Sequence, residues 1–194
     1  GLDAGLSISY NSLVWTKYTN TSNNETTMVF DADASNVSPG FRFGFPVIEP
    51  AYYNGATAKF AYLMVMPSGE RVEFRQTPWI DTYEAADSSY SLLKINNAGS
   101  PFDPIENITI TVFTTDGTQI SYQWKAGAYR CWRIQDRNGN RIDITHNDQG
   151  LLTKITDTLG REINVNYDAE LFPTSVTQTW KTNNGAGTNA THTW

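Results

Sequence analysis

Apolar and polar residues alternate one by one along two neighbouring stretches in the last third of the chain. Ile142 and Ile144 alternate with polar residues in the first stretch, and Ile163, Val165 and Tyr167 do so in the second. A period of two with β-branched residues is typical of a half-buried strand, because successive side chains point to opposite faces. The pattern therefore predicts two strands, but it leaves open which face of each strand points inward.

A tight turn is predicted just before each of these strands. Asp136 is followed three places later by Gly139, and Asp157 is followed in the same way by Gly160. An Asp at the first turn position accepts bonds from turn amides, and Gly at the fourth position tolerates positive φ. Each unit is therefore predicted to be a hairpin of strand, turn and returning strand.

The two hairpin units repeat each other with a constant spacing. The offset from Asp136 to Asp157 is 21 residues, and it also relates Ile134 to Ile155 and His146 to Tyr167. A fixed period near 20 residues indicates one supersecondary unit that is used more than once. Related hairpins, without this spacing, are predicted upstream at Gly69–Phe74 and Gly117–Tyr122.

The stretch Ile134–Asp168 resembles the YD repeat of RHS-repeat proteins. The second unit carries the resemblance, with L-T-K-I-T-D-T-L-G-R from Leu152 to Arg161 and Tyr167-Asp168 at its end. The first unit has His146-Asn147-Asp148 where Tyr-Asp would stand. The opening G-L-S-I-S-Y-N-S, Gly5–Ser12, is similar to the segment that precedes the repeats in such proteins.

The resemblance implies a structural role in a large exported bacterial protein, outside the cell or at its surface. In relatives, successive hairpins spiral into a hollow β-shell that can enclose a C-terminal cargo, often a toxin. Residues 1–131 would be a β-rich region that precedes the repeats, and 132–194 would be YD-type hairpins with an incomplete last unit. The expected partners are downstream repeats of the parent chain, an enclosed toxin, or a surface glycan or protein.

Several elements outside the two units are also predicted. Phe60–Met66 is nearly all apolar, which is typical of a central strand buried on both faces. The alternating Phe41, Phe43 and Phe45 lie among prolines and favour an edge strand. One helical turn is expected at 84–87. A third unit is expected to begin at Thr174, and its returning strand at 191–194 would form the edge of the sheet.

Composition and charge support an all-β fold of antiparallel hairpins in a twisted, continuing sheet. The chain of 194 residues is 13 % aromatic and 18 % charged, with abundant Ser, Thr and Asn. A net charge of −6 without a basic stripe argues against a nucleic-acid partner. No apolar run in the sequence approaches the length of a membrane-spanning helix.

The sequence offers little catalytic or metal-binding chemistry. Cys131 is the only cysteine and is expected to be buried, and His146 is expected to pack inward with a hydrogen bond. Asp136-Arg-Asn138-Gly-Asn140 begins like a calcium loop, but the later positions of that motif do not match. We expect no catalytic residue, no metal and no cofactor.

Two other functions remain open from the sequence. Six Trp and ten Tyr in a small acidic chain are compatible with a module that binds carbohydrate or an adhesion partner. A glycosidase would rest on Asp136 and Asp157 as a carboxylate pair, although both residues already have a role in their turns. The repeat-motif positions to which we assign a structural role are Asp136, Gly139, Ile142, Ile144, Asp157, Gly160, Ile163, Val165, Tyr167 and Asp168.

Overall fold

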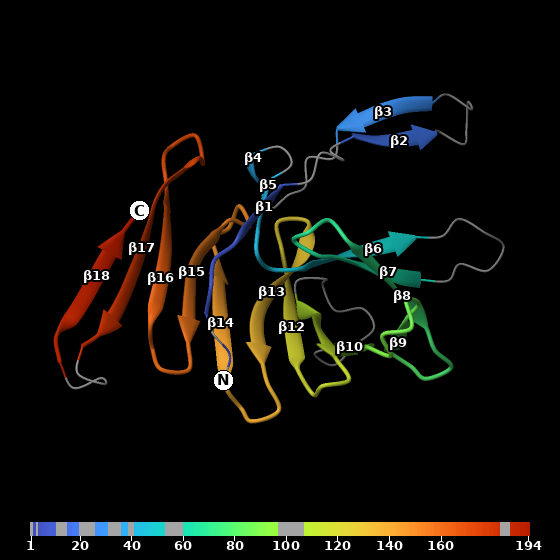
Figure 1. Ribbon diagram of the computed structural model, residues 1–194. Coiled ribbons are helices and arrows are strands. Elements are labelled where there is room, and N and C mark those ends of the chain that lie inside the picture. Colours follow the sequence, from blue (N-terminus) through green and yellow to red (C-terminus); the bar gives the residue numbers. More distant parts are fainter. Residues whose placement is uncertain are drawn as a thin grey trace.

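A computed structural model describes residues 2, 4–10, 15–19, 26–30, 36–38, 41–52, 60–96, 107–182 and 187–194. The predicted all-β, antiparallel fold is confirmed, because every strand pairing is antiparallel and these residues form no α-helix (Figure 1). The strands are β1 (Ile8–Tyr10), β2 (Trp15–Thr19), β3 (Thr26–Phe30), β4 (Asn36–Ser38), β5 (Phe41–Phe43), β6 (Val47–Tyr52), β7 (Phe60–Val65), β8 (Arg71–Gln76), β9 (Thr82–Ala85), β10 (Leu92–Asn96), β11 (Thr109–Phe113), β12 (Gln119–Lys125), β13 (Ala128–Gln135), β14 (Arg141–His146), β15 (Leu152–Asp157), β16 (Glu162–Tyr167), β17 (Pro173–Lys181) and β18 (Asn189–Thr193).

Most of the strands belong to one large sheet that contains a barrel. Strands β6 to β12 follow one another as neighbours, and β13 pairs with both β6 and β12. These eight strands close into a ring, and β14 to β18 continue from β13 as an open sheet. Hairpins in a continuing sheet were predicted, whereas the closed barrel was not.

Strand β13 is the point where the sheet forks. Its first half pairs with β6 through Tyr129 and Arg130, and its second half pairs with β14 through Arg133–Gln135. Opposite this change the pairing with β12 slips by one residue, which leaves Trp132 as an extra residue in a β-bulge. Such bulges bend a strand and increase its twist, so this one accompanies the passage from barrel to open sheet. The boundary predicted between residues 131 and 132 falls inside β13.

A single hydrophobic core runs through both parts. Its largest members in the barrel include Phe74, Leu93, Ile110 and Tyr122, none of which exposes measurable surface. An eight-stranded barrel has an interior just wide enough for side chains to fill, so this space is a core and not a channel. The same cluster continues onto one face of the open sheet, which we call the inner face.

The N-terminal segment, residues 2 and 4–10, covers part of the inner face. Leu2, Ala4 and Leu6 pack against the core cluster, and the segment runs alongside β14 in Figure 1. It ends in β1, which pairs with β5. Strand β5 lies between β1 and β4, so the prediction of an edge strand for the alternating Phe residues was wrong.

Two other local predictions had opposite outcomes. The central strand expected at Phe60–Met66 is confirmed as β7, which lies between β6 and β8 and buries Met64 and Val65 on opposite faces. The helical turn expected at 84–87 is wrong, because Glu84 and Ala85 belong to β9. Pairing with β8 and β10 decides the conformation there, and local helix propensity does not.

Candidate functional site: the repeat turns, the inner face and the fork

The first repeat turn has the predicted geometry. Asp136 Oδ1 accepts hydrogen bonds from the backbone N–H of Asn138 at 2.8 Å and of Asn140 at 3.0 Å. Gly139 has φ of 84° and donates its N–H to the Asp136 carbonyl at 3.1 Å. The Asn140 side-chain amide, which donates to Asp136 Oδ2 at 2.7 Å, and the two backbone bonds hold the pKa of the Asp136 carboxyl below its ordinary value.

The second repeat turn is the same structure 21 residues later. Asp157 Oδ1 accepts bonds from the N–H of Leu159 and of Arg161, both at 2.9 Å, and Gly160 has φ of 75°. Asp157 is buried, and its other oxygen pairs with the Arg161 guanidinium. Both carboxylates are therefore occupied by turn bonds, as the sequence predicted.

Each unit also contains a second turn that the sequence reasoning missed. Asn147 Oδ1 accepts the N–H of Leu151 at 2.8 Å, and Asp168 Oδ1 accepts the N–H of Phe172 at 2.8 Å. The fourth position is Gly150 in one turn and Leu171, with φ of 69°, in the other. The Asp of the Tyr-Asp pair thus opens a turn. The Asn147-x-x-Gly150 pattern could have revealed the second turn of the first unit, but Leu171 stands in place of the glycine in the next unit and hides the repetition.

The predicted alternation of the two strands is confirmed, and the structure shows which face of each strand points inward. Ile142, Ile144, Ile163 and Val165 are buried on the inner face. Tyr167 follows on the same face and donates its hydroxyl to the Leu152 carbonyl at 2.7 Å. Burial raises the pKa of this phenol to about 12.

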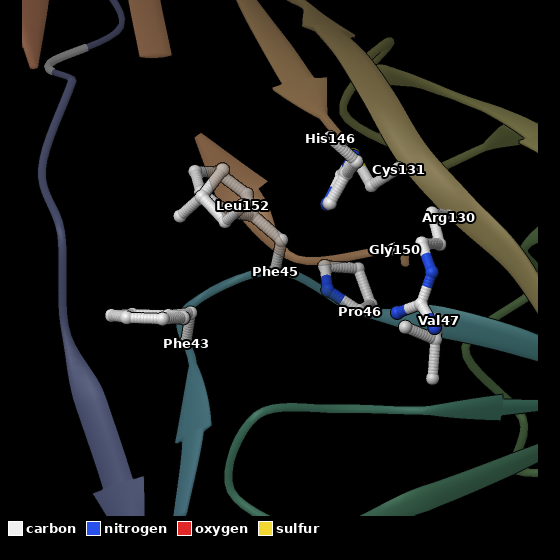
Figure 2. A pocket seen from close by; sticks show the side chains of 9 residues that line it. All are labelled: Phe43, Phe45, Pro46, Val47, Arg130, Cys131, His146, Gly150 and Leu152. Carbon is white, nitrogen blue, oxygen red and sulfur yellow. The ribbon is translucent and has the colours of Figure 1, made fainter. Parts of the chain in front are cut away.

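A small cavity lies at the fork, between the barrel and the first repeat unit. It measures about 20 Å³, which is room for one water-sized molecule and too little for a substrate. Figure 2 shows the side chains that line it, which come from the end of β5 to the start of β6, from β13 and from the end of β14 onward. The lining residues are Phe43, Phe45, Pro46, Val47, Arg130, Cys131, His146, Gly150 and Leu152.

Arg130 is a buried cation beside this cavity, with only 1 % of its surface exposed. Its Nε donates to the Lys125 carbonyl at 3.0 Å, and Nη2 lies 3.5 Å from the Ala126 carbonyl. The guanidinium lies against Gly150, where a Cβ would come within 2.4 Å of Nε. Glycine is therefore required at this position both for its φ of 79° and for the close approach of Arg130.

His146 points into the same cavity in Figure 2 and occupies the position that Tyr167 takes in the next unit. Burial, together with the positive charges of Arg130 and Lys125, lowers its pKa to about 4. Its Nδ1 is buried and has no hydrogen-bond partner within the described part of the chain. The inward position is as predicted, but the predicted hydrogen bond is absent at Nδ1.

A second hollow lies under the N-terminal segment, toward the free edge of the sheet. It is an open groove of about 410 Å³. The described lining is apolar apart from the Gln178 amide and the indole N–H of Trp194, which stands at the end of the groove with 65 % of its surface exposed. The lining residues are Ala4, Gly5, Leu6, Ile8, Ile163, Val176, Gln178 and Trp194.

Other reactive groups in the described part of the chain are inert or dispersed. Cys131 is buried as predicted, and burial raises the pKa of its thiol far above the ordinary range. Within the described residues no group of three or more His, Cys, Asp or Glu is placed to hold a metal ion. Asp136 is the first residue of the calcium-like sequence. One of its carboxylate oxygens accepts bonds from two backbone amides, and the other accepts a bond from the Asn140 side-chain amide at 2.7 Å.

No family model matches the chain, and no curated protein matches it. None of the described residues forms a helix long and apolar enough to cross a membrane.

Proposed function

We propose that this chain is a structural, non-catalytic segment of a large exported YD-repeat protein, in which it forms part of a β-shell. The shell would enclose a C-terminal toxin or mediate contact at the cell surface. The observation that carries the proposal is the pair of equivalent turns in each 21-residue unit, which adds two strands at a time to one growing sheet.

The free edge at β18 supports this proposal. The large sheet is closed at one end by the β12–β13 pairing, while β18, among the described strands, pairs with β17 alone. Strand β18 carries no charge, proline or bulge that would discourage another strand from pairing with it. Natural sheets protect such edges, so this edge is suited to continuation by a further repeat.

The proposal is tested by extending the sheet. Residues 147–167 contain a turn, a strand, a second turn and a second strand, so two copies fused after Trp194 should continue the repeat. In repeat arrays each new neighbour adds an interface, so the urea midpoint and the m-value should both rise within one cooperative transition. A fusion with the same residues in scrambled order serves as the matched control. Limited proteolysis compares the two fusions. If a protease digests the added copies as fast as the scrambled ones, the proposal is contradicted.

Export is a separate part of the proposal. An antibody raised against this chain should detect the parent protein in the medium or on intact cells, at a mass far above 21.7 kDa. A cytoplasmic control protein should remain inside the same cells. Detection of the parent only after lysis would contradict the exported location.

A carbohydrate or adhesion module is the second candidate, and exposed aromatic residues favour it. Trp79 is 75 % exposed, Tyr90 70 % and Trp194 65 %. Such rings offer flat apolar faces on which sugars stack. Titration with a panel of polysaccharides should then change the tryptophan fluorescence, and Trp79→Ala or Trp194→Ala should remove that change. A fluorescence signal that ignores every polysaccharide would count against this candidate.

A further inference from the structure

The cavity at the fork joins three parts of the fold. Residues 43–47 run from the end of β5, in the small β1-β5-β4 sheet, to the start of β6 in the barrel, and Arg130 and Cys131 belong to β13. His146 and Gly150 belong to the first repeat unit. Loss of packing around this cavity would therefore weaken the contact between the first repeat unit and the start of the barrel at β6 and β13.

The charges around His146 disfavour protonation of its imidazole ring. Arg130 of β13 lines the cavity, and the Lys125 ammonium of β12 donates to the His146 carbonyl at 3.1 Å. None of the nine lining side chains is a carboxylate. Asp148, in the turn that follows His146, lies 3.3 Å from Lys125 but is 97 % exposed, so solvent screens it. The other lining side chains are the Cys131 thiol and apolar groups.

We propose that this cavity is an acid-sensitive switch, in which protonation of His146 separates residues 43–47 from the turn at 147–151 and opens the fork. This inference rests on the cavity itself and does not depend on the proposed shell function.

The physical reason is that no carboxylate among the described lining residues is placed to stabilise a protonated imidazole. It would add a third positive charge beside Arg130 and Lys125 in a space that admits a single water. Its buried Nδ1 has no acceptor in the closed state. Opening lets water reach the ring and moves it away from the two cations.

Proton linkage gives the sign and the size of the pH effect on the opening equilibrium. The closed state holds the pKa of His146 at about 4, whereas a solvated histidine titrates near 6.5. Between these values the open state binds a proton that the closed state does not, so the opening equilibrium shifts toward the open state as the pH falls. The opening constant should therefore rise about 30-fold between pH 7.5 and pH 5.

Cys131 is a built-in reporter of this opening. It lines the same cavity, is 1 % exposed and is the only cysteine of the chain. Its labelling by 4,4′-dithiodipyridine, which reacts with thiols in acid, should report the open state. The rate is divided at each pH by that of the urea-unfolded chain. Wild type should show the rise of about 30-fold between pH 7.5 and pH 5. His146→Gln should show almost none, and His192→Gln should behave as wild type.

An equal rise in His146→Gln, or none in wild type, would overturn the proposal. If His146→Gln does not fold, hydrogen exchange of the wild type decides. Peptides that cover 41–47 and 147–152 should gain exchange at pH 5, relative to intrinsic rates, while a peptide over β11 should not. A uniform gain over all peptides would indicate global acid unfolding and would equally overturn the switch.

Discussion

The residue at the fourth position of each repeat turn must adopt a positive φ. Gly160 has φ of 75°, in the left-handed region, and nothing in the surroundings would contact an added Cβ. Any effect of a substitution there therefore comes from backbone conformation. Leu171 adopts φ of 69° at the equivalent position of the next turn, so that turn already bears the cost that Gly160 avoids.

We expect Gly160→Ala to lower the free energy of unfolding by about 1–2 kcal/mol, because a non-glycine residue in the left-handed region costs that much. Urea unfolding monitored by circular dichroism measures the change. Leu159→Ala is the matched control, since Leu159 is 79 % exposed in the same turn. It should change the free energy of unfolding by less than about 0.5 kcal/mol. Equal losses in the two variants would contradict the account of the turn.

Tyr167 makes a second prediction at this scale. Tyr167→Phe removes the hydroxyl that donates to the Leu152 carbonyl, so the free energy of unfolding at pH 7 should fall by about 1 kcal/mol. The folded state raises the pKa of this phenol to about 12, so its contribution is complete below pH 10 and is lost as the pH rises from 10 to 12. The difference between wild type and variant should therefore shrink over that range. A difference that stays constant up to pH 12 would contradict the assignment.

At the scale of elements, the two Asp turns are alike in geometry but differ in burial. Asp136 and Asp157 each accept two backbone amides, yet only Asp157 is buried, with 6 % exposure and an ion pair to Arg161. Thr158 also ties the second turn to β14, because its Oγ1 accepts the N–H of Arg141 at 2.6 Å and donates to the Arg141 carbonyl at 2.9 Å. The second turn is therefore bonded to the unit before it.

We expect Asp157→Ala to lower the free energy of unfolding by about 2–3 kcal/mol, because it removes bonds to a buried carboxylate, and Asp136→Ala to lower it by less. The reason is that a buried turn cannot replace the lost bonds with water, whereas an exposed turn can. Thermal unfolding of both variants under the same conditions measures the order. If Asp136→Ala were the more damaging variant, Asp136 would need a role outside its turn.

The sequence predicted elements best where the local signals agreed. Alternation, Asp and Gly together predicted β13 to β16 and the turns at Asp136 and Asp157, because each signal is local and the register follows from the turn. The turn at Asp168 was missed because Leu171 breaks the glycine pattern. The strand at Thr82–Ala85 was mistaken for a helical turn because its pairing partners, β8 and β10, are tertiary and leave no local sign.

At the scale of the whole molecule, the barrel could not be read from the pattern. Its closure depends on β13 pairing with β6, and these strands are separated by most of the barrel sequence. The bulge at Trp132 and the cavity beside His146 follow from that closure, so they too were outside the reach of local reasoning. The sequence did anticipate the free edge, which is β18.

The N-terminal segment, which covers part of the inner face, gives a prediction at the scale of the whole molecule. Leu6 packs against the core cluster and lines the groove under the segment. We expect Leu6→Ser to weaken the cover and to increase binding of a dye such as ANS, because the apolar inner face then meets water. Ser9→Ala, a small change at a half-buried polar position of β1, is the control. Unchanged dye binding in Leu6→Ser would mean that the segment does not protect the inner face.

The central claim is that this chain is a segment of a longer repeat shell, and the source gene beyond the codon for Trp194 tests it most directly. The account predicts many more units with the 21-residue spacing, each with the Asp-x-x-Gly turn and a second turn opened by Asp or Asn, followed by an unrelated tail. A stop codon close behind Trp194 would contradict the shell. The binding module with exposed aromatic residues would then become the leading explanation.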